Sequence, residues 1–195
     1  MRHFAFFATL FAFSLLASLA SAQQADAALG FSALMSPGAS TCSPATLTCP
    51  EKGGVYPSVN ADVIFHRRIG FGYEVAWRGS QGSYFGQPYR PIINAFNAVF
   101  QPRISKKVGL DLVAGVGFQD TRYYLPYCTN PVTCSNYTTS KHFLVDIGGG
   151  IRYYVWGHMF LRPEVRFYNL HNNTDFTSGN IVRVGASIGY TIGPE

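Results

Sequence analysis

The stretch that decides the fold is I-V-R-V-G-A-S-I-G-Y-T-I-G, from Ile181 to Gly193. Its even-numbered residues are all apolar: Val182, Val184, Ala186, Ile188, Tyr190 and Ile192. Its odd-numbered residues include the polar or small Arg183, Gly185, Ser187, Gly189 and Thr191. Because successive side chains of a strand point to opposite faces, this pattern predicts a strand with one apolar and one polar face.

Seven further segments alternate in the same way. We expect strands at residues 27–36, 57–66, 69–79, 90–104, 108–123, 141–155, 158–171 and 179–193. The connections between them are alternately long and short, which is typical of outer-membrane barrels with short periplasmic turns. The sequence therefore predicts an all-β fold, a closed antiparallel eight-stranded up-and-down transmembrane β-barrel whose long loops lie outside the cell.

The N-terminus has the three parts of a secretory signal within residues 1–22. A basic start precedes the apolar stretch Phe4–Leu19, and Ala20-Ser21-Ala22 resembles a cleavage site. The alternative is a retained anchor, but the stretch is shorter than the roughly 20 residues that a spanning helix needs. We expect cleavage, which leaves residues 23–195 as one barrel domain in the outer membrane of a Gram-negative-type bacterium.

Charge is sparse and unevenly placed along the chain. Charged residues make up 13% of it, against about 25% in an average soluble domain. The apolar row of the strands is nearly free of charge, and its aromatic residues lie towards strand ends, as lipid contact requires. Although the net charge is +5, the basic residues form no stripe, so nucleic-acid binding is not expected.

The polar row of the strands collects charges of both signs. The carboxylates are Asp62, Glu74, Asp111, Asp146 and Glu164, and the arginines are Arg78, Arg103, Arg152, Arg162, Arg166 and Arg183. Ion pairs would satisfy these groups inside a barrel that is just wide enough for side chains to fill. We therefore expect a charge network that plugs the lumen, and a narrow pore or small-molecule transporter is the alternative.

The segment 90–104 is ambiguous. Phe96 and Phe100 indicate that its even-numbered residues face outward, but Asn94 would then face lipid. Prolines also flank the run, so a bulge or a change of register is one way to resolve the conflict.

The four cysteines form two local pairs, Cys42 with Cys49 and Cys128 with Cys134, each around a turn-rich segment. An exported, oxidising setting favours disulfides within each pair. Metal binding is the competing interpretation, but the pairs lack C-x-x-C spacing and a nearby histidine. We expect no metal and no cofactor.

A lipid-modifying enzyme would need a serine within hydrogen-bond reach of a histidine. Only His142 has such a close sequence neighbour, Ser140, and both lie at a loop rim where polar residues are ordinary. We therefore expect no catalytic site. The loops carry many tyrosines, which either pack at the rim or recognise an unknown ligand.

The chain resembles the OmpA-like group of small eight-stranded outer-membrane barrels. The likeness rests on the closing strand V-G-A-S-I-G-Y-T-I-G, and the segments N-A-F-N-A-V-F-Q-P-R and R-P-E-V-R-F-Y are similar to those of uncharacterised outer membrane beta-barrel proteins. The resemblance implies a monomer that contacts outer-membrane lipid and the barrel-assembly machinery. It also implies a structural or surface-interaction role through the loops.

Overall fold

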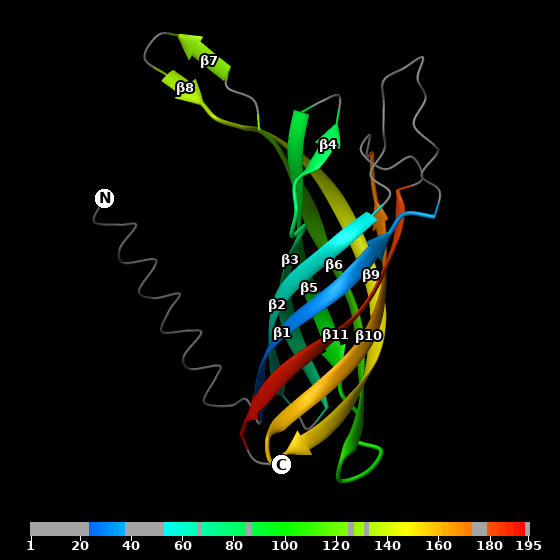
Figure 1. Ribbon diagram of the computed structural model, residues 1–195. Helices are drawn as coiled ribbons and strands as arrows, with labels where there is room; N and C mark the ends of the chain where they lie inside the picture. Colours follow the sequence, from blue (N-terminus) through cyan, green and yellow to red (C-terminus); the bar gives the residue numbers. More distant parts are fainter. Residues whose placement is uncertain are drawn as a thin grey trace, which may run out of the picture.

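The computed structural model describes residues 24–37, 53–65, 68–84, 87–124, 127–130, 133–172 and 179–193. The predicted signal sequence and the Cys42/Cys49 loop lie outside these residues. Eight long strands dominate the described part (Figure 1). They are β1 (Gln24–Met35), β2 (Gly53–Phe65), β3 (Ile69–Trp77), β5 (Gln87–Phe100), β6 (Val108–Tyr123), β9 (Thr138–Trp156), β10 (Met159–Leu170) and β11 (Asn180–Ile192).

The strands close into a barrel, as the sequence predicted. Each long strand pairs antiparallel with its neighbours in the chain, β3 pairs with β5, and β1 pairs with β11, so no edge is left open. The register path from Ala25 runs around the barrel and returns to β1 at Met35, ten residues along. Its steps are Val63, Phe71, Ala98, Ala114, Ile147, Phe167 and Val182. This stagger is the strand tilt that closing a barrel requires.

Three short strands extend one end of the barrel, where the sequence predicted only loops. β4 (Gly82–Tyr84) continues the wall by pairing with β5, while β7 (Tyr127–Asn130) and β8 (Thr133–Ser135) form a separate hairpin. The opposite end has short turns, such as the two residues Gly157 and His158 between β9 and β10. Gly157 has a φ of 51°, a left-handed conformation that glycine adopts without strain. The barrel thus has a long-loop end and a short-turn end (Figure 1).

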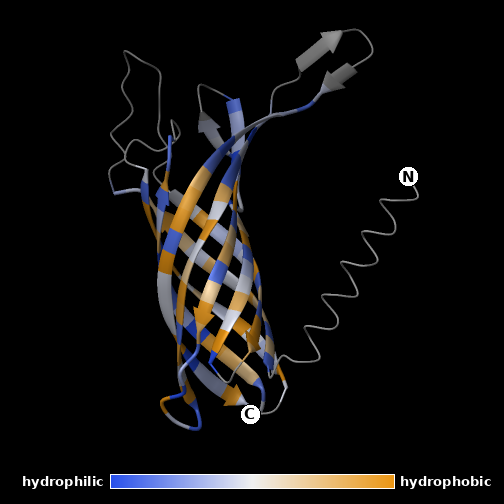
Figure 2. Ribbon diagram, turned by 180° about the vertical axis from the view of Figure 1, so that it is seen from behind, coloured by the Kyte–Doolittle hydropathy of each residue, from blue (hydrophilic) through white to orange (hydrophobic). Residues whose placement is uncertain are grey.

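Alternation along the strands sorts the side chains into two sets. The apolar set faces outward, and Leu29, Phe71 and Ile147 are each at least 60% exposed. The other set faces the lumen and includes the buried charged residues. Figure 2 shows the resulting alternation of hydrophobic and hydrophilic residues along the barrel wall.

β5 corrects the expectation of a bulge in this segment. Its pairings with β3 and β6 run without a register shift, and Phe96 and Phe100 face outward. Asn94 also faces outward, where its Oδ1 accepts a hydrogen bond of 2.8 Å from the hydroxyl of Tyr73 on β3. The amide is therefore satisfied by a neighbouring strand rather than by a change of register.

The lumen is layered rather than uniformly polar. At the long-loop end, buried apolar side chains form a layer; its members are Leu34, Tyr56, Ala76, Ile93, Leu144, Tyr168, Leu170 and Ile181. Two smaller apolar clusters lie towards the short-turn end, one around Phe160 and one around Val99. The buried charged residues occupy the middle, between these apolar layers.

Candidate functional site: the charged lumen

The half of the network nearer the short turns joins three aspartates to two arginines. Arg152, on β9, donates two hydrogen bonds: one of 2.6 Å from Nη1 to Asp26 Oδ2 and one of 3.1 Å from Nη2 to Asp111 Oδ2. Arg162, on β10, donates a hydrogen bond of 2.6 Å from Nη1 to the same Asp111 oxygen. The same Nη1 lies 3.5 Å from Asp62 Oδ2. Five strands thus contribute to one cluster of charge-assisted hydrogen bonds, which are stronger than neutral ones.

The half nearer the long loops is built around Glu74 on β3. Its carboxylate forms an ion pair with Arg166, at 2.7 Å from Nη2, and also contacts Arg183 Nη1. Asp146, on β9, lies 3.3 Å from Arg166 Nη1. Arg166 and Arg183 stand directly opposite each other on β10 and β11, and two like charges in such a pair repel. Glu74 relieves that repulsion by bridging them.

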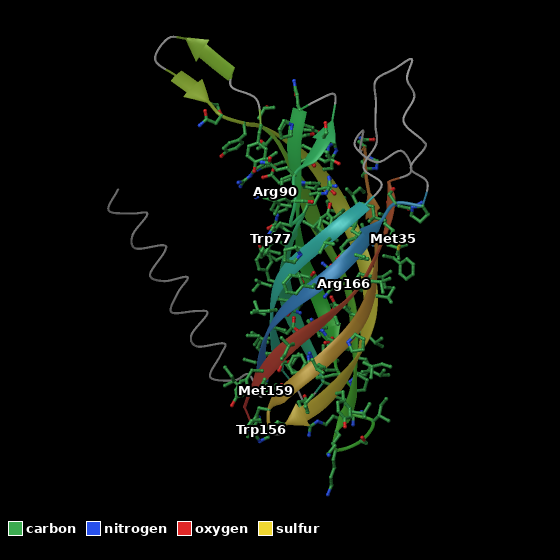
Figure 3. The ribbon with its side chains drawn as sticks, in the orientation of Figure 1. Met35, Trp77, Arg90, Trp156, Met159 and Arg166 are labelled. Atoms are coloured by element: carbon green, nitrogen blue, oxygen red, sulfur yellow. The ribbon has the colours of Figure 1, made fainter. Side chains whose placement is uncertain are left out.

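Glu164 connects the two halves. Its carboxylate lies 3.1 Å from Arg162 Nε and 3.0 Å from Arg183 Nη2. All four arginines of the network are at most 3% exposed, and Figure 3 shows Arg166 within the barrel. A buried charge is costly unless it is paired and hydrogen-bonded, and each arginine here contacts at least two carboxylates.

Sequence reasoning missed Asp26, because the first strand was expected to begin one residue after it. β1 begins at Gln24, so Asp26 has the same inward parity as Ala28 and Ser32. Gln24 and Gln101 donate side-chain hydrogen bonds to Asp26 at 3.0 Å and 3.2 Å. These amides supply donors in a network where the buried carboxylates outnumber the buried arginines.

Two predicted members of the inward row lie apart from the network. Arg78 follows the last residue of β3, beyond the apolar layer that contains Ala76. Its Nη1 donates a hydrogen bond of 3.3 Å to the Tyr89 hydroxyl. Arg103 is exposed in the turn after β5, with its guanidinium 5.1 Å from the centroid of the Tyr154 ring. Both were predicted from strand ends that extended beyond the observed ones.

Close packing fills the space around the network. The Arg152 guanidinium lies 4.1 Å from the centroid of the Phe160 ring, a cation–π geometry. Gly150 and Gly148 on β9 face Arg162 and Arg166, and a Cβ at Gly150 would lie 3.0 Å from Arg162 Cγ. The gap left between Asp111, Arg162 and Glu164 has no room for a water molecule.

The structure also brings Ser140 and His142 together. Ser140 Oγ lies 2.8 Å from His142 Nε2, at the long-loop end of β9. Among the described residues, no carboxylate is hydrogen-bonded to this imidazole, so the third group that orients a catalytic histidine is not seen there. In the same part of the chain, no group of three or more metal-ligating side chains is placed to hold a metal ion.

The remaining predicted residues are the cysteines. The backbones of Cys128 and Cys134 stand directly opposite each other in the β7–β8 hairpin, and Cys42 and Cys49 lie outside the described residues. In the described segments, no helix is both long and apolar enough to cross a membrane.

The closed barrel, its apolar outer face and its buried ion pairs define a class, the small eight-stranded barrels of the outer-membrane type. Solved structures of that class are similar to this chain. Neisserial surface protein A matches with a TM-score of 0.61 and 11% identity over 86% of this chain and 95% of that one. The N-terminal barrel domain of Pseudomonas aeruginosa OprF matches with a TM-score of 0.55 and 8% identity, over 88% of this chain and 98% of that one.

The attachment invasion locus protein Ail of Yersinia pestis matches with a TM-score of 0.54 and 11% identity, over 88% of this chain and 99% of that one. At such low identity these likenesses show a shared fold only. No protein-family model matches the chain, and a search of curated proteins finds no match.

Proposed function

We propose that the protein is an integral outer-membrane barrel, exported by cleavage of residues 1–22, which acts as a monomer in a structural or surface-interaction role. The observation that carries this proposal is the outward row of side chains. Across the eight long strands, the row holds charge only near the long-loop end, at Arg90, Asp120, Arg122 and Lys141. Apolar side chains cover the rest almost entirely, and a lipid-facing surface has this composition.

The lumen is proposed to be closed. The network of buried ion pairs supports this, as does the apolar layer across the long-loop end. Eight strands leave an interior that side chains can fill, and here arginine side chains and ring carbons occupy it.

A role for the loops follows from the long-loop end. Tyr137 is 43% exposed there, and the β7–β8 hairpin extends beyond the barrel wall (Figure 1). The opposed backbones of Cys128 and Cys134 support a disulfide, because directly paired strand residues have a Cα separation that a disulfide can span. We therefore propose disulfide-braced loops as the contact surface for an unidentified ligand.

Electrophoretic migration tests the placement. Folded protein in detergent should run as a compact band that shifts only after boiling, and reductant should alter the loops without unfolding the barrel. A protein that is freely soluble without detergent, and whose migration does not depend on heating, would contradict the proposal.

A narrow pore remains the first alternative, and planar-bilayer recording separates it from a closed barrel. Pure inserted protein should give no steady single-channel steps. Such steps from the wild type would show that water and ions cross the proposed plug.

The contact between Ser140 and His142 is the observation that favours a second alternative, a lipid-modifying enzyme. We propose that the protein is not an enzyme, so envelope lipids should have the same acyl composition with the wild type as with Ser140→Ala. An acyl-chain change that depends on Ser140 and His142 would overturn this.

A further inference from the structure

The outward charges of the barrel are confined to one sector. Arg90 lies on β5, Asp120 and Arg122 on β6, and Lys141 on β9, three strands that are neighbours in the sheet. All four residues lie near the long-loop end. Figure 3 shows Arg90 beyond Trp77, at the end of the barrel opposite Trp156 and Met159. This sector has three cations and one anion.

The strand register pairs these charges unequally. Asp120 stands opposite Lys141, a match of opposite signs. Arg90 stands opposite Arg122, and like charges in directly opposed positions are destabilising. The Arg122 guanidinium lies 5.3 Å from the centroid of the Tyr137 ring, which holds its position without neutralising its charge.

The lumen shows how the chain treats such a pair when it supplies the counter-ion itself. Arg166 and Arg183 are opposed in the same way, and Glu74 bridges them. Among the described residues, no carboxylate forms an ion pair with Arg90 or Arg122, and the Nε atom of each lacks a hydrogen-bond partner. The outer pair therefore lacks the bridging anion that the inner pair has.

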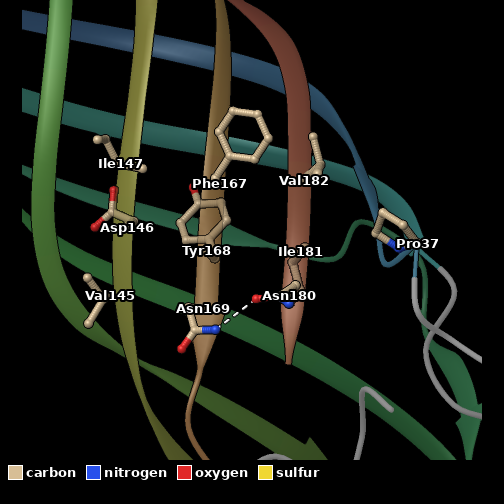
Figure 4. A pocket seen from close by; sticks show the side chains of 10 residues that line it. All are labelled: Pro37, Val145, Asp146, Ile147, Phe167, Tyr168, Asn169, Asn180, Ile181 and Val182. Atoms are coloured by element: carbon tan, nitrogen blue, oxygen red, sulfur yellow. Dashed lines mark hydrogen bonds between the residues drawn. The ribbon is translucent and has the colours of Figure 1, made fainter. Parts of the chain in front are cut away.

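An apolar groove lies beside this sector, on the outer face of β9, β10 and β11 (Figure 4). It has a volume of about 510 Å³, and Val145, Ile147, Phe167 and Val182 line it. At the end of the groove nearer the long loops, Asn169 Nδ2 donates a hydrogen bond of 2.7 Å to Asn180 Oδ1. Along β9 only one outward residue, Phe143, separates Lys141 from Val145, so the cations and the groove share a strand.

We propose that this sector binds a phosphorylated lipid of the leaflet at the long-loop end. A phosphate group bridges Arg90 and Arg122, and an acyl chain lies in the groove of β9, β10 and β11. Phosphate fits because its oxygens accept hydrogen bonds from two guanidinium groups at once, and charge-assisted bonds of this kind are strong. The inference rests on the proposed membrane placement.

The test compares two glycolipid probes that differ only in phosphate: diphosphoryl lipid A and the same lipid after removal of both phosphates. Each is added to wild-type protein in detergent, and the retained lipid is counted by native mass spectrometry. The wild type should retain the phosphorylated lipid preferentially. Arg90→Gln/Arg122→Gln should lower that affinity by about tenfold or more, because each lost bond to a charged group weakens binding.

The matched control is Lys106→Gln/Lys107→Gln, which removes the same charge from exposed positions at the short-turn end and should leave retention unchanged. Equal retention of both probes by the wild type, or equal losses in the two double variants, would overturn the proposal. Displacement by millimolar inorganic phosphate would show a free-anion site rather than a lipid site. Heat-dependent migration of every sample shows separately whether the barrel is folded, so failure of the membrane placement is distinguishable from failure of lipid binding.

Discussion

Polar side chains on the two faces of this barrel are satisfied in different ways. Inside, each buried guanidinium is shared by carboxylates from several strands, and Glu74 contacts two arginines that would otherwise repel each other. Outside, one amide, Asn94, is satisfied by one tyrosine, Tyr73. In the proposed membrane placement neither environment supplies bulk water as an alternative partner, so removal of one group should be costly in both.

Replacement of Glu74 by glutamine tests the inner arrangement. The variant leaves Glu164, at 3.9 Å from Arg166 Nε and 3.0 Å from Arg183 Nη2, as the carboxylate that the two arginines share. Because the two closest contacts to Glu74 are lost, we expect a loss of about 3 kcal/mol or more in the free energy of unfolding. Urea unfolding in lipid vesicles, followed by tryptophan fluorescence, measures it. Lys106→Gln, which removes an exposed charge, should change stability little, and a Glu74→Gln variant as stable as this control would contradict the bridging role.

The outer hydrogen bond can be tested by a double-mutant cycle. Tyr73→Phe should cost about 1–3 kcal/mol, because it leaves the Asn94 amide unsatisfied. The same change in an Asn94→Leu background should cost much less, since no amide then needs a partner. Equal losses in the two backgrounds would show that the hydroxyl of Tyr73 acts elsewhere.

At the scale of the strand, alternation was readable from sequence and strand ends were not. The facing of β2, β3, β6, β9, β10 and β11 agrees with the prediction, because a period of two fixes every side chain once one is placed. Asp26 was missed and Arg78 was misplaced because each lies within a residue or two of a strand end. Near the ends, sequence does not show where pairing with a neighbour stops.

The layering of the lumen was also not predictable from one strand at a time. Leu34, Ile93 and Leu144 face inward in three separate strands, and only the register brings them to one level. The partners within the charge network likewise come from separate strands, and the register brings them together. Composition gives the set of charged residues, whereas the stagger around the barrel decides which arginine reaches which carboxylate.

The glycine run of β9 offers a test at this scale. Gly148 faces the lumen, where a Cβ would lie 2.7 Å from Arg166 Cγ and from the Val165 carbonyl oxygen. Gly148→Ala should therefore destabilise the barrel by about 1–3 kcal/mol through overpacking. Gly149 faces outward, and its Cβ would lie 3.1 Å from the end of the Leu112 side chain and 3.3 Å from the Asp111 carbonyl oxygen, both longer than the 2.7 Å contacts at Gly148. Gly149→Ala is the matched control, and urea unfolding that ranked it below Gly148→Ala in stability would contradict the assigned facing.

For the whole molecule, we propose that the apolar belt lies in a bilayer and that a plug of ion pairs and apolar layers closes the lumen. The closed eight-stranded fold follows from alternation and alternating loop length, and it was predicted. A ligand for the loops could not be predicted, because loop chemistry at the long-loop end is set by residues that no periodic pattern constrains.

The chain has two tryptophans, Trp77 and Trp156, which lie towards opposite ends of the barrel (Figure 3). Trp156 is 81% exposed, as expected for an interfacial residue that contacts lipid headgroups. Each can be observed alone in a variant whose other tryptophan is replaced by phenylalanine.

Fluorescence quenching by lipids brominated at defined depths tests whether the apolar belt lies in a bilayer. With the barrel inserted in vesicles, we predict that both tryptophans are quenched most strongly by bromine near the headgroups and less by bromine near the chain ends. If neither tryptophan were quenched by any brominated lipid, the belt would not lie in a bilayer, and the account would be contradicted.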